Sequence, residues 1–287
     1  MRRLIINADD FGLTSGVNRA IVEANRSGVL TSATMMANAQ AFAEAASLAK
    51  AQPALKTGCH IVLIDGDPVS PNLNSLTNGA SRLRFRTSFK EFAFAAVRRR
   101  LSAEEIQREA EAQIRKIQVM GLTLTHVDSH KHTHMFPQVL RPVLRAARAC
   151  GIRAVRNPFE PLRSWPGSAL LGAPSLWLRC AGVTSFKMFA NGFRRAVKEE
   201  GMVSTDGTVG IAATGKLDQK MFLAIINRLP EGTWELVCHP GHSDTDLRNA
   251  GTRLIASREI ELSALTSAET KEALARQKIE LISYADL

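Results

Sequence analysis

Short apolar segments alternate with segments of helical periodicity along most of this chain, which restricts its fold to a small group. The segments predicted to be strands are residues 4–6, 33–36, 57–63, 124–128, 152–155, 207–212 and 235–238. The predicted helices are residues 16–27, 41–51, 102–120, 137–149, 217–228 and 267–276. Repeated alternation of this kind is typical of an α/β fold with a parallel sheet or barrel inside a layer of helices. No linker rich in Gly, Pro or Ser interrupts it, so we expect one domain over residues 1–287.

Helix-capping residues mark both ends of the helix predicted over residues 102–120. Ser102 is a predicted N-cap and Glu105 stands three residues later, which predicts a capping box, and Gly121 ends that helix. Residues 65–92 and 158–191 fit the alternation poorly, and the first of these is expected to run over one rim of the sheet. Long irregular loops in a compact domain are usually lids or substrate loops.

The chain has a formal net charge of +10, and its basic residues are dispersed apart from a cluster at 98–100. It has a single Tyr and no basic motif interleaved with aromatic residues, so we expect no nucleic-acid partner. Attraction to an anionic membrane surface explains the excess positive charge at least as well as nucleic-acid binding does. Because no run of about 18 apolar residues occurs and the first apolar stretch is too short for a signal peptide, we expect a cytoplasmic protein, with peripheral contact at the inner face of the membrane as a further option.

The four cysteines, at positions 59, 150, 180 and 238, form no CxxC pair. We therefore expect neither a disulfide framework nor a structural zinc site. Cys59 and Cys238 each stand directly before a histidine in an apolar run. Because neighbours on a strand point to opposite faces, these thiols are expected to be buried if the histidines face a site.

Polar clusters follow several of the apolar runs and so lie at the carboxyl ends of predicted strands, where parallel α/β folds place their sites. The first cluster is NADDFG, residues 7–12. Two adjacent carboxylates oppose each other's ionisation. A metal cation relieves that repulsion and leaves one carboxylate free to act as a base. The alternative is a helix N-terminus at which Asp10 or Thr14 is the capping residue.

The strongest cluster is HVDSHKHTH, residues 126–134, which holds four of the seven histidines. Imidazole is the commonest protein ligand for zinc and related metals, and Asp128 is suited to orienting a ligand imidazole. Ligands on neighbouring residues diverge, so the four histidines do not all bind one ion. His60 in GCHIVL and His239 in CHPGH are further candidates. Their alternatives are a buried core histidine for His60 and a loop-capping histidine for His239.

Together these segments resemble the YdjC/ChbG family of carbohydrate deacetylases. The resemblance spans almost the whole chain, is weak over residues 65–100 and 158–206, and is greater for the hopanoid-biosynthesis (HpnK-type) branch. The family's fold is a distorted (β/α) TIM-like barrel with fewer than eight regular strands. The similar segments are NADDFGLTSGVNRAI, VLTSATMMAN, GCHIVL, THVDSHKHTHMFPQVL, VCHPGH and ASREIELSALTS.

The resemblance implies a metal-dependent N-deacetylase in which Asp10, His60 and His130 hold one divalent ion. Mg²⁺ or Zn²⁺ is expected, and Mn²⁺ or Co²⁺ also suits these donors. Asp9 would be the general base for a metal-bound water that attacks the acetyl carbonyl, and His239, as imidazolium, would protonate the leaving amine. Residues implied to orient ligands or bind substrate are Asn7, His126, Asp128, His132, His134, His242 and Arg258.

The implied substrate is an N-acetylated amino sugar and, for the HpnK branch, an N-acetylglucosaminyl hopanoid glycolipid. The apolar, Trp-bearing stretch 165–177 would suit an enzyme working at a bilayer, and its alternative is a buried helix. Two other functions stay open: a metal-dependent phosphoesterase or amidohydrolase on a similar barrel, and a non-catalytic sugar- or lipid-binding protein. Phosphoesterases and amidohydrolases of this kind usually carry an HxH motif on their first strand and bind two or three metals. The first strand here ends in DD, which argues against them. A homodimer is expected only from base rates.

Overall fold

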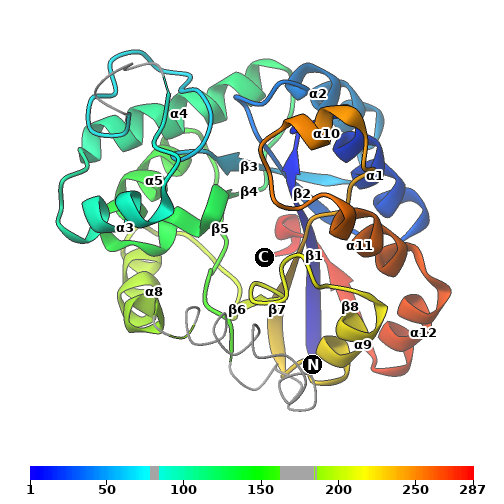
Figure 1. The fold of residues 1–287 in the computed structure, drawn as a ribbon. Helices are drawn as coiled ribbons and strands as arrows, with labels where there is room; N and C mark the ends of the chain where they lie inside the picture. Colours follow the sequence, from blue (N-terminus) through cyan, green and yellow to red (C-terminus); the bar gives the residue numbers. More distant parts are fainter. Residues whose placement is uncertain (78–83, 162–183, 185) are drawn as a thin grey trace.

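The computed structural model describes residues 1–77, 84–161, 184 and 186–287. Its strands form one parallel sheet that curls into a distorted barrel, as expected (Figure 1). Seven strands follow one another in the order β5-β4-β3-β2-β1-β7-β6, and β8 pairs with β1 beside this path. The strands are β1 (Arg2–Phe11), β2 (Ser32–Met35), β3 (Lys56–Ile61), β4 (His126–Ser129), β5 (Ala154–Val155), β6 (Gly207–Val209), β7 (Gly232–Cys238) and β8 (Ile279–Ile282).

The distortion of the barrel is concentrated at two places. One side of β1 pairs with β8 along its first half and with β2 along its second half, while β7 pairs along the other side. The two end strands, β5 and β6, are joined by short contacts instead of a ladder. Val203 exchanges backbone hydrogen bonds with the β5 segment, and Thr208 in β6 donates its backbone N–H to the carbonyl of Phe159.

The helices lie outside the strands, and one apolar core fills the layer between them (Figure 1). α4 packs on α5 beside β3, and α12 packs on α9 and β8. The helices are α1 (Ser15–Ser27), α2 (Phe42–Ala51), α3 (Phe89–Val97), α4 (Ala103–Val119), α5 (Pro137–Ala149), α8 (Ala190–Glu199), α9 (Gln219–Asn227), α10 (Thr245–Asn249), α11 (Ala256–Thr266) and α12 (Ala268–Arg276), with 3-10 turns η1 (His130–Met135), η3 (Phe186–Phe189) and η4 (Tyr284–Asp286).

The predicted capping box at the start of α4 is only half formed. Ser102 accepts a hydrogen bond from the backbone N–H of Glu105, as predicted. The Glu105 carboxylate does not reach back to Ser102; it accepts from the backbone N–H groups of Asn74 and Ser75. That carboxylate instead ties the irregular segment after β3 to α4, because a loop crossing the rim must find partners for its own backbone groups.

Several elements were not predicted from the sequence. They are α3, α8, α10, α11 and β8. α3 begins inside the stretch 65–92, and Asp65, Arg84 and Phe89 of that stretch line the cavity described below. Residues 165–177 lie outside the described residues.

Two simpler expectations are met in the described chain. Cys59 and Cys238 are fully buried, and the three described cysteines are free thiols. Among the described helices, none has both the length and the apolar character needed to cross a membrane.

Candidate active site

Strand register brings the polar side chains of separate motifs together inside the barrel. His60 pairs with Asp128 across β3 and β4, and the two side chains hydrogen-bond at 2.7 Å (Nδ1 to Oδ1). Ala8 pairs with Cys238 across β1 and β7, so Asp9 and His239 follow side by side. Paired residues of parallel strands point to the same face, which explains why motifs far apart in sequence meet here.

A backbone irregularity lets both carboxylates of the DD pair face the site. The register between β1 and β2 shifts between Ala8 and Phe11, and Asp10 has a left-handed φ of 67°. In a regular strand Asp9 and Asp10 would point to opposite faces. The bulge turns the second side chain toward the same cavity, at the cost of backbone strain that is common at functional sites. Of the two residues considered as helix N-caps, Thr14 is the one that caps α1, since its side chain accepts a hydrogen bond from the backbone N–H of Val17.

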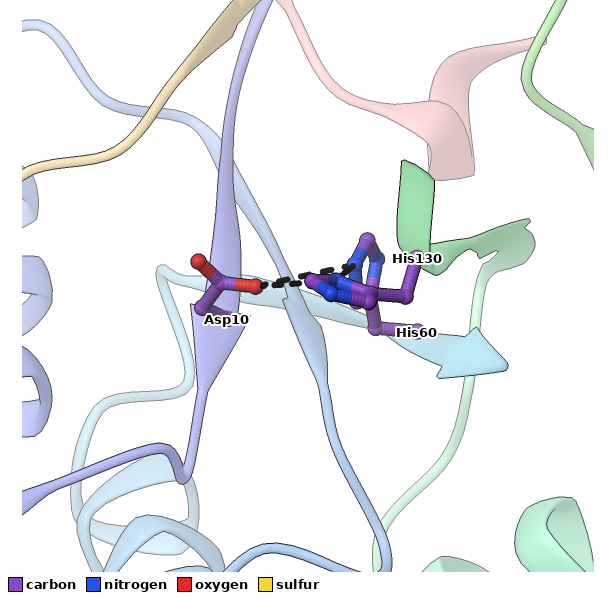
Figure 2. A group of neighbouring side chains, drawn as sticks. All are labelled: Asp10, His60 and His130. Atoms are coloured by element: carbon purple, nitrogen blue, oxygen red, sulfur yellow. Dashed lines mark hydrogen bonds and ion pairs between the residues drawn. The ribbon is translucent and has the colours of Figure 1, made fainter. Parts of the chain in front are cut away.

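Asp10, His60 and His130 point toward one another from β1, β3 and the start of η1 (Figure 2). Asp10 Oδ1 lies 3.7 Å from His60 Nε2 and 3.5 Å from His130 Nδ1, and the two nitrogens are 3.4 Å apart. Metal–ligand bonds of about 2.0–2.1 Å at tetrahedral angles would separate donor atoms by about 3.4 Å. The three donors therefore fit a single small divalent cation.

The other polar atoms of His60 and Asp10 are hydrogen-bonded to neighbours, and that of His130 faces a carboxylate at a longer distance. Asp128 holds His60 Nδ1, which leaves Nε2 facing the centre of the triad. Arg258 donates to Asp10 Oδ2 at 2.6 Å, and Asp65 lies 3.9 Å from His130 Nε2. Burial lowers the pKa of His60, but the charges of Asp128 and Asp9 outweigh burial and raise it to about 9.

Arg156, which sequence reasoning missed, is a fully buried guanidinium directly after β5. It pairs with Asp9 through both terminal nitrogens, at 2.6 and 2.9 Å, with Asp128 at 2.7 Å and with Glu235 on β7 at 2.7 Å. Burial raises the pKa of Asp9, but the charges of Arg156 and His60 together with the Arg156 hydrogen bonds outweigh burial and hold that pKa far below its usual range. Asp9 is therefore ionised and fixed in orientation.

A second group of potential ligands, Asp9, His60 and Asp128, is also close enough to hold an ion. Arg156 already supplies a positive charge to both of its carboxylates, and His60 directs Nδ1 to Asp128. A second cation there would face a buried guanidinium at contact distance. Among the described residues, Asp10, His60 and His130 are thus the better metal-binding group.

His239 lies at the end of β7, with Nε2 3.9 Å from Asp9 Oδ2. Its pKa is lowered to about 4, because burial outweighs the opposite effect of the Asp9 and Asp10 charges. The imidazole is thus neutral at neutral pH, which differs from the sequence-based expectation of an imidazolium. The physical reason is burial of the ring next to two carboxylates that already have arginine partners, Arg156 and Arg258.

The remaining predicted site residues divide into two groups. Asn7 donates to Asp9 Oδ1 at 3.1 Å, and His132 lines the cavity, so both lie at the site. His126 stacks on Tyr284 lower in the barrel, and His134 uses both ring nitrogens to hold Ser129 and the Arg156 carbonyl. His242 lies at the surface, 3.2 Å from Glu23. The structure does not bring these last three to Asp10, His60 and His130 or to the cavity lining.

A cavity of about 990 Å³ lies over this group of side chains. Its floor is formed by Asp10, His60 and His130 together with Asp9 and His239. Segments from the rim supply the walls, and the apolar part of the lining is Leu13, Met36, Ala39, Phe89, Ile211, Ala250 and Leu254. The site therefore combines a charged floor with partly apolar walls, in a space large enough for more than one sugar ring.

The model of the YdjC-like protein family matches residues 3–276. The chain belongs to this family. A carbohydrate deacetylase of Brevibacillus brevis is 34% identical over 286 residues, covering 99% of both chains. A carbohydrate deacetylase of Vibrio parahaemolyticus is also 34% identical and covers 99% of this chain and 96% of the relative.

A solved structure of a putative cellobiose-phosphate cleavage protein from Enterococcus faecalis superposes with a TM-score of 0.79. The two share 26% identity and cover 99% and 98% of the respective chains. All the residues placed at the cavity floor fall within the part matched by the YdjC-like family model, whereas Tyr284, which donates to Glu235 from below, falls beyond it.

Proposed function

We propose that this YdjC-like protein hydrolyses the N-acetyl group of an amino sugar with the help of one divalent ion. The observation that carries the proposal is the cavity floor, where a three-donor group, an ionised carboxylate and a histidine face the same space. The carbohydrate deacetylases that are 34% identical over nearly the full length support the same reaction class.

Asp10, His60 and His130 would hold the ion, because their donor atoms form a compact triangle and the other polar atoms of Asp10 and His60 are already hydrogen-bonded. When bound, a divalent ion lowers the pKa of a water molecule and polarises the acetyl carbonyl. The set of donors, one carboxylate and two imidazoles, is compatible with Zn²⁺, Mg²⁺, Mn²⁺ or Co²⁺.

Asp9 would take the proton from the attacking water. One face of its carboxylate is fixed by Arg156, and Oδ2 also faces His239 across 3.9 Å at the cavity floor. A fixed base loses little entropy in reaching its proton, which compensates in part for its low basicity. His239 would donate a proton to the sugar nitrogen as the carbon–nitrogen bond breaks, because Nε2 faces the cavity floor.

For the substrate, we propose an N-acetylated amino sugar carrying a further group, with an N-acetylglucosaminyl hopanoid glycolipid as the specific case. The cavity of about 990 Å³ exceeds what one sugar ring requires, and Phe89, Ile211 and Leu254 offer apolar contacts above the charged floor. Apolar walls with a few convergent polar groups are usual for sites that take partly apolar ligands.

We also propose that α3 contacts an anionic membrane surface. Phe89 at its first turn lines the cavity, whereas Phe94 and Val97 are 51% and 61% exposed. The side chains of Arg98 and Arg100 lie over the Phe94 ring, at 5.0 and 5.4 Å from its centroid. Exposed apolar groups beside several arginines suit the boundary between headgroups and acyl chains.

The direct test is mass spectrometry of acetate release from a panel of N-acetylated sugars and glycolipids, with the deacetylated amine measured in parallel. Equal amounts of acetate and free amine from at least one substrate are expected. Tight binding of a sugar with no acetate release would identify a sugar-binding protein instead. Hydrolysis of phosphate esters in place of the acetamides would identify a phosphoesterase.

A further inference from the structure

Glu261 on α11 contacts His239 directly but was not among the residues expected at the site. It is 1% exposed, and its Oε2 accepts a hydrogen bond from the backbone N–H of His239 at 2.6 Å. This bond joins α11 to the end of β7 at the residue proposed as the proton donor. It also holds the Glu261 carboxyl group beside the His239 ring.

Two buried polar atoms in this contact lack hydrogen-bond partners within the described part of the chain. They are Nδ1 of His239 and Oε1 of Glu261. His239 Nδ1 lies only 3.9 Å from Glu261 Oε2. Since an N–H···O bond spans about 2.7–3.2 Å, a shift of about 1 Å would join the two side chains. Unpartnered polar atoms are rare inside proteins, and at active sites they often find their partner during the reaction.

We propose that Glu261 is the positioning residue of His239 and holds the proton that His239 relays to the leaving amine. This inference rests on the proposed deacetylase function. The arrangement follows the general rule that a histidine active at Nε2 is oriented through Nδ1 by a carboxyl group.

The proton balance of this step is complete. As the carbon–nitrogen bond breaks, the nitrogen keeps the electron pair of that bond and takes the Nε2 proton of neutral His239. Nδ1 of the same ring takes the proton of the Glu261 carboxyl group, which becomes a carboxylate. His239 is neutral before and after, and the proton that Asp9 accepted from water later passes through solvent to the Glu261 carboxylate, which restores both groups. No further reactant is required.

The charges around the pair agree with one shared proton. His239 faces Asp9 and Asp10 from β1, His60 from β3 and Arg258 from α11, and Asp9 and Asp10 already have arginine partners. Burial raises the pKa of Glu261 to about 7, although its bond to the His239 backbone and the Arg258 charge oppose this. Between about pH 4 and pH 7 the carboxyl group is thus protonated, whereas the ring is neutral and carries a proton on one nitrogen only.

The test compares Glu261→Gln with Glu259→Gln, a matched control on the same helix. Glu259 is exposed and accepts from the backbone N–H of Ser243 in the same way. The amide introduced by E261Q can still accept from the His239 backbone but cannot release a proton. We expect E261Q to lower kcat on an N-acetylated sugar by roughly 10²-fold. An activated aryl acetate ester, whose leaving group needs no proton, should lose less than about threefold. Equal losses on both substrates would overturn the proposal.

A pH titration of the His239 ring by ¹⁵N NMR tests the pair without relying on activity. In wild type and E259Q, the Nδ1 signal should show a step near the Glu261 pKa of about 7. The step should be absent in E261Q. If wild type shows no such step, the proposal is wrong, whatever substrate the protein proves to hydrolyse. If the step is present and no acetamide is cleaved, the pair stands and the proposed deacetylase function fails.

Discussion

Replacing Arg156 with Met tests how the interior of the barrel holds its charges. Arg156 is fully buried and contacts Asp9, Asp128 and Glu235 at 2.6–2.7 Å. Met has a similar length and no charge, so the replacement leaves three buried carboxylates without their common cation. Each carboxylate keeps at least one other hydrogen-bond donor; Tyr284, for example, donates to Glu235 at 2.5 Å.

The size of the effect follows from the burial of the group. Removing one partner of a buried ion pair usually costs about 3–5 kcal/mol, because the remaining charge is left uncompensated. Three carboxylates lose their cation together, but each keeps other hydrogen bonds. We therefore expect a total loss of stability close to that of one ion pair and not the sum of three. A loss of about 4 kcal/mol would lower the melting temperature by on the order of 10 °C in a chain of this size.

The effect should depend on pH with a definite sign. In the wild type, burial raises the pKa values of Asp9 and Asp128, but the charges of Arg156 and His60 together with their hydrogen bonds outweigh burial and lower both values. Their stabilising contribution is therefore present above the unfolded pKa of about 3.9 and is lost as the pH falls below it. Without Arg156, burial is opposed mainly by His60, so both pKa values rise above those of the wild type and the variant loses stability relative to the wild type as the pH rises. The gap between the two proteins should be largest near pH 7 and narrow toward pH 4.

Urea denaturation followed by circular dichroism at several pH values measures this gap. Arg153→Met is the matched control, since Arg153 is exposed and lies three residues before Arg156. The control should stay within about 0.5 kcal/mol of wild type. A cost below about 1 kcal/mol for Arg156→Met at pH 7, or a gap that widens at low pH, would refute the assignment of Arg156 as the common counter-ion.

Three further outcomes are expected from the site and from α3. His60→Ala and His130→Ala should each lose bound metal in elemental analysis, and retention of near-stoichiometric metal would remove that residue from the ligand set. Asp9→Asn should keep its metal and lose turnover by about 10²–10⁴-fold, because the amide cannot accept a proton; metal loss would make Asp9 a ligand. Replacing residues 98–100 with Gln should abolish co-sedimentation with phosphatidylserine vesicles and leave hydrolysis of a soluble sugar unchanged, whereas unaltered co-sedimentation would exclude α3 as the contact.

Periodicity and motif position predicted the elements that carry the site. The helix predicted over 137–149 has the bounds of α5, and the strands ending near Asp9, His60, Asp128 and His239 are all present. These predictions succeed because alternation of apolar runs and helices leaves few arrangements for a parallel sheet. The carboxyl ends of its strands then meet at one rim.

The missing parts depend on three-dimensional detail that the sequence does not display. The bulge at Asp10 arises from pairing between β1 and β2 and has no local signal such as Gly at the position with positive φ. Arg156 follows a two-residue strand, and nothing in the local sequence distinguishes it from a surface arginine. Only the fold shows that Asp9 and Glu235 surround it. Glu261 lies in a helix of mixed polarity, and only the fold shows that it faces His239.

The protein is proposed to remove N-acetyl groups from amino sugars with the help of one divalent ion held by Asp10, His60 and His130. This function is tested most directly by adding metal in steps to chelator-treated protein while measuring acetate released from an N-acetylated amino sugar. We expect acetate release to rise from baseline and to level off at one equivalent of bound metal per chain. Acetate release that persists without metal, or that requires two bound ions per chain, would contradict the claim.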